Sequence, residues 1–116
     1  IAVQQKGAAD VLLTSTLKSA TLVRSPTIPD AVELVKLEKA EALAGIKTFL
    51  FPVSDKLPGT RVLDGHIAIE DLGIGVPKGR ELGAAYVRSG VSDMKSQGFV
   101  KATIDNSGVR GLLTAP

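Results

Sequence analysis

The residues most suited to chemistry lie where a short apolar run meets a glycine. Ile1–Gln5 is β-like, and Lys6-Gly7 leads directly into the helical pattern of Ala8–Ser19. Such a turn points free backbone N–H groups and the positive helix end at whatever lies in front of it, which suits a carboxylate. The alternative is an ordinary turn that needs glycine for backbone freedom. The predicted ligand contacts are Gln5, Lys6, Gly7, Ala8 and Ala9.

A second cationic position follows another apolar run. Glu41–Ile46 has the small apolar residues of a buried strand, and Lys47 comes directly after it. A lysine at that place would favour an anionic ligand. The alternative is the solvated start of a helix.

His66 is the single histidine of the chain. A small hydrolase could use it as a general base beside Asp64, Glu70 or Asp71. However, the chain has no Gly-x-Ser-x-Gly segment, and a histidine flanked by glycine is typical of a surface loop. We therefore assign no catalytic residue. One histidine and no cysteine also argue against a transition-metal site, and no cofactor is expected.

The stretch Lys78-Gly79-Arg80 has the composition of a phosphate loop but not its spacing. We interpret it as the exit of an extended segment into a helix, with Glu81 in the favourable first turn.

The composition indicates one domain of 116 residues whose core is made of Val, Leu, Ile and Ala, because aromatic residues are only 3%. A net charge of +2, with scattered basic residues, argues against nucleic-acid binding. No apolar run reaches the roughly 18 residues of a membrane span. Because the chain starts at Ile1 and shows no signal peptide, we expect a processed product, a fragment or an incomplete sequence.

Strands and helices are expected to alternate, which predicts an α/β fold with a mainly parallel sheet and helices on both faces. Thr27 is the expected N-cap of a helix through about Lys39, with Asp30 in its first turn. Pro52 is expected to break or restart the following helix. The other expected elements are strands at Ala20–Arg24 and Arg61–Asp64, an extended His66–Val76, a helix ending near Gly98 and a second helix over Phe99–Gly108.

Four phrases together resemble a known family. They are "IAVQQKGAADVLLTSTLKSATLVR", "EALAGIKTFL", "LPGTRVLDG" and "IGVPKGRELGAAYVRSGVSDMKSQGFVKATIDNSGVRG". In order and spacing they resemble the periplasmic solute-binding proteins of ABC transporters, in particular the type-2, family-3 extracellular amino-acid-binding group. The chain resembles only the C-terminal half of such a protein.

The resemblance implies one lobe of a two-lobed protein that holds its ligand in the cleft between lobes. Residues 1–70 would form the second lobe, 71–76 a hinge-like crossing strand, and 77–116 helices that pack on the first lobe. In the family the turn after the first strand receives the α-carboxylate of the ligand, and Arg24 would face the cleft edge. Ile46 stands where many members carry the aspartate that pairs with the ligand's ammonium. A small polar or anionic solute, bound weakly by this half-length chain, is therefore expected.

The helix after Lys78 carries an apolar stripe that needs a cover, since each large side chain left in water forfeits roughly 1.5–3 kcal/mol. The helices could fold back onto the sheet of this chain, exchange with those of a second copy in a homodimer, or pack on a missing N-terminal half. We expect the first two together, as a compact α/β unit that forms a dimer. The resemblance also implies membrane transporter subunits as partners and a periplasmic or secreted location. A non-catalytic dimeric interaction module remains an alternative function. The stripe consists of Ala84, Val87, Val91 and Met94.

Overall fold

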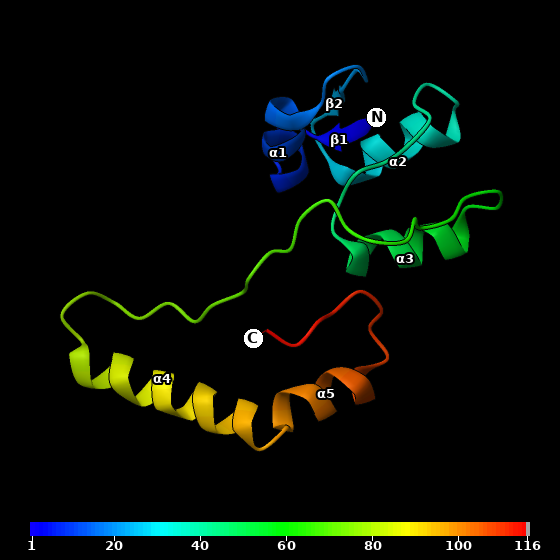
Figure 1. Ribbon diagram of the computed structural model, residues 1–116. Coiled ribbons are helices and arrows are strands. Elements are labelled where there is room, and N and C mark those ends of the chain that lie inside the picture. Colours follow the sequence, from blue (N-terminus) through cyan, green and yellow to red (C-terminus); the bar gives the residue numbers. More distant parts are fainter. Residues whose placement is uncertain (116) are drawn as a thin grey trace. The chain divides into compact units, whose positions relative to one another are not determined.

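The computed structural model describes residues 1–115, which divide into two compact units, an N-terminal unit Ile1–Val62 and a C-terminal unit that begins at Leu63 (Figure 1). The described chain is α/β, with five helices and one small parallel sheet of two strands. The expected class is therefore present, although its sheet is much smaller than the sequence suggested.

The sheet lies in the N-terminal unit. Strand β1 (Ala2–Gln4) pairs in parallel with β2 (Val23–Ser25), with Val3 opposite Arg24. On the other edge of β1, Ala2 donates to the Ala42 carbonyl and accepts from the Ala44 N–H, which forms a single parallel bridge to Leu43. The spatial order is thus β2, β1 and then the Leu43 segment.

The strand expected over Glu41–Ile46 is reduced to that one bridge. Its small apolar residues permit a strand, but only the atoms around Leu43 find a partner backbone. Arg61–Asp64 was likewise expected to be a strand, and it is irregular. An apolar run forms a ladder only where another strand edge accepts it, and a sequence pattern does not locate that edge.

Two helices flank the sheet on opposite sides of β1: α1 (Ala8–Thr16) and α2 (Ile28–Lys36) (Figure 1). A connection from β1 to β2 carries α1, and the connection from β2 to the Leu43 segment carries α2. Because the chain leaves β1 toward one edge and later returns to the other edge, right-handed crossovers place the two helices on opposite faces.

Helix α2 has well-defined ends. The Asp30 N–H donates to the Thr27 hydroxyl oxygen at 3.3 Å, and that hydroxyl donates to the Asp30 carboxylate at 2.6 Å, so the predicted N-cap is confirmed. The helix ends earlier than the expected Lys39. Glu38 adopts a left-handed φ of 56°, its N–H donates to the Val35 carbonyl, and the next N–H reaches the Leu34 carbonyl. These two hydrogen bonds form a Schellman motif.

The buried core of the N-terminal unit is small. Two of its members, Ala2 and Val3, come from β1, and the remaining members come from the flanking helices and the loop after α2. Alanine lets backbones approach closely but removes little apolar area from water. The buried hydrophobic residues are Ala2, Val3, Leu13, Ala31 and Ala40.

Helix α3 (Lys47–Lys56) continues through Pro52, so the expectation that Pro52 would break or restart it is wrong. Proline removes one N–H, which leaves the Thr48 carbonyl without its usual helical donor. The first turn is closed by N–H donors of Phe49 and Leu50 to the Ile46 carbonyl. These bonds start the helix ahead of the defect.

The C-terminal unit contains α4 (Glu81–Ser96) and α5 (Phe99–Ser107), joined at Gly98, whose φ of 73° is left-handed. His66–Val76 is irregular and forms no strand within residues 1–115. No described residue of this unit is fully buried. The apolar stripe of α4 faces an open groove, whose lining includes Ile74, Val76 and Val87. None of the described helices is long and apolar enough to cross a membrane.

Candidate functional site

The turn between β1 and α1 is tight, but its strain is not where the sequence suggested. Lys6, and not Gly7, takes the left-handed conformation, with a φ of 62°, whereas Gly7 has a φ of −75°. Space favours glycine at position 7 instead, because a Cβ there would lie 3.1 Å from the Gln4 carbonyl oxygen, a tight contact with the backbone. The Gly7 N–H donates to that same carbonyl at 3.1 Å. The glycine therefore permits the close approach that folds the chain back into α1.

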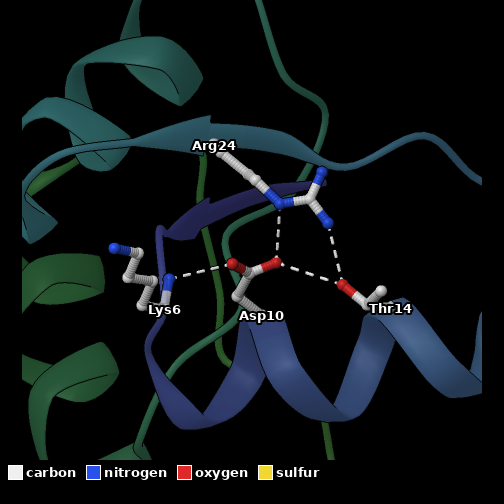
Figure 2. Close-up of polar contacts among 4 residues, drawn as sticks. All are labelled: Lys6, Asp10, Thr14 and Arg24. Atoms are coloured by element: carbon white, nitrogen blue, oxygen red, sulfur yellow. Dashed lines mark hydrogen bonds and ion pairs between the residues drawn. The ribbon is translucent and has the colours of Figure 1, made fainter.

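Asp10 holds this turn to the sheet, as Figure 2 shows. Its carboxylate accepts the Lys6 backbone N–H at 2.9 Å, the Arg24 Nε–H at 2.8 Å and the Thr14 hydroxyl at 3.2 Å. Arg24 also donates from its terminal nitrogen to the Thr14 hydroxyl at 2.8 Å. One carboxylate thus ties the turn, α1 and β2 together.

The surroundings favour the charged form of Asp10. The N–H of Lys6 is the main cause that holds the pKa of Asp10 below its ordinary value of 3.8, and Arg24 and Thr14 act in the same direction. Burial opposes them, since the residue is only 7% exposed. The ion pair between Asp10 and Arg24 is therefore a structural contact at the N-terminal end of α1.

Donors remain at the front of the turn. Within residues 1–115, the backbone N–H groups of Ala8, Ala9 and Asp10 have no hydrogen-bond acceptor. They belong to the first turn of α1, where the helix dipole is positive. The Lys6 side chain extends away from the Asp10 carboxylate, as Figure 2 shows. Together these groups present positive potential in front of the carboxyl end of β1.

The strand order gives this end of the sheet a special place. The strand order changes direction at β1, because the chain adds β2 on one edge of β1 and then crosses to add the Leu43 segment on the other edge, with all strands parallel. The carboxyl ends of β1 and of the Leu43 segment therefore border a topological switch point, which is where open α/β sheets bind ligands. The predicted residues Gln5–Ala9 follow β1, and Lys47 follows the Leu43 segment by four residues.

The predicted site residues divide into two groups. Gln5, Lys6, Gly7, Ala8 and Ala9 form the turn itself, and Lys47 is the first residue of α3. Arg24 differs, because it lies on β2, on the edge away from the switch point, and its guanidinium binds Asp10 and Thr14. Within residues 1–115, Lys47 has no hydrogen bond or ion pair to this cluster.

The site predicted from the sequence does not include Asp10 or Thr14. The available signal was an acidic residue at the third helical position after a strand-to-helix turn, with a hydroxyl four residues later on the same face. That pattern predicts a carboxylate folded back onto the turn.

The other candidates stay isolated. His66 is exposed and, among the described residues, has no hydrogen-bond or ion-pair partner, so no base and orienting carboxylate come together there. Gly79 has a left-handed φ of 79°, and Arg80 is the N-cap of α4, which fits the expected exit into a helix. In residues 1–115 no three His, Cys, Asp or Glu side chains gather as a metal-binding group would.

Comparison with protein-family models, with curated proteins and with solved structures gives no significant match for this chain.

Proposed function

We propose that this chain is the ligand-binding lobe of an ABC-type solute-binding protein of the type-2, family-3 kind, and that it binds a small anionic solute without catalysis. The observation that carries this proposal is the reversal of strand order at β1. That reversal brings the turn after β1 and the region before Lys47 to neighbouring strand ends. The resemblance of the sequence to solute-binding proteins supports the same position for the ligand.

The chemistry of the site favours an anion. Ala8 and Ala9 offer backbone N–H groups, while Lys6 and Lys47 offer ammonium groups near the same end of the sheet. Ile46 supplies no carboxylate for a ligand ammonium, so dicarboxylates and phosphate fit better than ordinary α-amino acids. Asp10 remains engaged with Lys6 and Arg24, and it orients the turn rather than the ligand.

Affinity of the chain by itself should be low. A two-lobed protein surrounds its ligand by hinge closure, and a lobe alone covers one side only. The exposed turn leaves the ligand partly in water, where each hydrogen bond competes with solvent. We expect saturation only at about millimolar solute.

Amide chemical shifts of the ¹⁵N-labelled full chain test the proposal. Succinate, glutamate and phosphate are titrated separately, and shifts should concentrate at Gly7, Ala8, Ala9 and Lys47. The double variant Lys6→Ala, Lys47→Ala should lose the response, whereas the control Lys39→Ala, an exposed lysine after α2, should keep it. Submicromolar binding, or shifts confined to other parts of the chain, would show that the proposed site or mechanism is wrong.

A further inference from the structure

The open apolar face of α4 is a feature that solute binding does not explain. The side chains of Ala84, Val87 and Val91 line the groove beside α4 and are half-buried. Met94 lines a neighbouring part of the groove and is 39% exposed. Ile74 lines the groove as well and is 65% exposed. We call the α4 positions Ala84, Val87, Val91 and Met94 the α4 seam. A seam of this kind is stabilised when a second apolar surface removes it from water.

We propose that the α4 seam pairs with the α4 seam of a second copy of this chain. The two helices run antiparallel, and the two-fold axis crosses the seam at the level of Ser89 along the helix. The seam residues are spaced alternately by three and four, which is the spacing of core positions in a two-helix coiled coil. In an antiparallel pair Ala84 meets Met94 of the other copy, and Val87 meets Val91. The small side chain faces the long one, and the middle layers match in size.

Charges beside the seam favour this orientation. Glu81 and Lys95 lie on the same flank of the seam, one near each end of α4. An antiparallel pair sets Glu81 of each copy against Lys95 of the other, whereas a parallel pair gives neither residue an opposite charge on that flank. On the opposite flank, Gly90 would lie against Gly90 of the other copy, which allows the two helix backbones to approach closely.

The position of Arg88 predicts repulsion between the two copies. It also lines the groove, and in the antiparallel pair it faces Arg88 of the other copy near the two-fold axis. Two guanidinium groups that face each other across the axis weaken association, even if their aliphatic stems pack on the seam. Arg88→Ala should therefore strengthen the dimer, which a merely structural role of Arg88 within one chain would not produce.

Sedimentation of the full chain over a range of concentrations tests the pairing. Val87→Asp should raise the dimer dissociation constant by about 100-fold or more, because each dimer loses two apolar contacts and gains two charges in the seam. Val11→Asp is the matched control: Val11 is 67% exposed on α1, and its variant should associate like the original chain. Circular dichroism establishes that each variant keeps its helices.

A mixing experiment tests the orientation. The variants Glu81→Lys and Lys95→Glu are each expected to associate more weakly than the original chain, and their equimolar mixture should form the heterodimer in preference to either homodimer. Because both states contain the same two chains, any effect of the substitutions on helix stability cancels. A mixture without preference overturns the antiparallel pairing. A chain that stays monomeric up to about 1 mM, or a dimer unaffected by Val87→Asp, overturns the seam as the interface.

Discussion

The left-handed residue at the end of α2 allows the sharpest test of the structure. Glu38 has a φ of 56° in the Schellman motif, and its side chain makes no hydrogen bond or ion pair within residues 1–115. A side chain in that conformation costs roughly 1–2 kcal/mol, whereas glycine adopts it without a steric penalty. Glycine also gives the unfolded chain more freedom, which offsets roughly 0.5–1 kcal/mol of the gain. Glu38→Gly should therefore stabilise the N-terminal unit by about 0.5–1 kcal/mol.

Thermal unfolding followed by circular dichroism measures this gain. For a unit of this size the midpoint should rise by about 2–8 °C. Glu33→Gly is the matched control, since the same change inside α2 removes a good helix former and the exposed ion pair with Lys36. It should destabilise by about 1 kcal/mol. If Glu38→Gly left the midpoint unchanged or lowered it while Glu33→Gly behaved as expected, the left-handed end of α2 would be wrong.

Three further predictions concern the turn, the core and α3. Val3 is fully buried, so Val3→Ala should lower the free energy of unfolding by about 2–3 kcal/mol, and a loss below about 0.5 kcal/mol in urea titration would show that the core lies elsewhere. The pKa of Asp10 is lower in the folded chain than the ordinary 3.8, so its contribution to stability is complete above that pH and is lost as the pH falls through the folded pKa. Asp10→Asn should remove this dependence, and acid titrations in which the two proteins lose stability in parallel would contradict the role of the carboxylate. Pro52→Ala restores a donor to the Thr48 carbonyl and should stabilise α3 by up to about 3 kcal/mol, seen as stronger helical circular dichroism, while unchanged helicity would mean that Pro52 does not lie inside a helix.

Local signals in the sequence predicted local structure well. Thr27 and Asp30 mark the start of α2, and the hydroxyl and carboxylate types that bond there are those that N-cap positions favour. The seam residues of α4 likewise follow helical spacing. These features depend on residues within one or two turns of each other, so a pattern can reveal them.

Features that depend on distant partners were harder to predict. Glu41–Ile46 has a strand pattern, yet pairing is limited to Leu43 because only Ala2 of β1 meets it. Arg24 was expected at a ligand cleft, but Asp10, fourteen residues earlier, binds its guanidinium. Neither outcome is encoded by spacing alone, because each is decided by which backbone edge or side chain tertiary folding brings near.

The absence of fully buried residues between Leu63 and Ala115 has a consequence for amide hydrogen exchange. In the monomer, opening α4 or α5 exposes little surface that was dry before, so their amides should exchange through frequent local unfolding, well ahead of those of β1. Trypsin should for the same reason cleave first after Arg88 or Lys95. Binding of any molecule to these helices would then be detected as slower amide exchange and slower tryptic cleavage in this part of the chain, even before the molecule is identified.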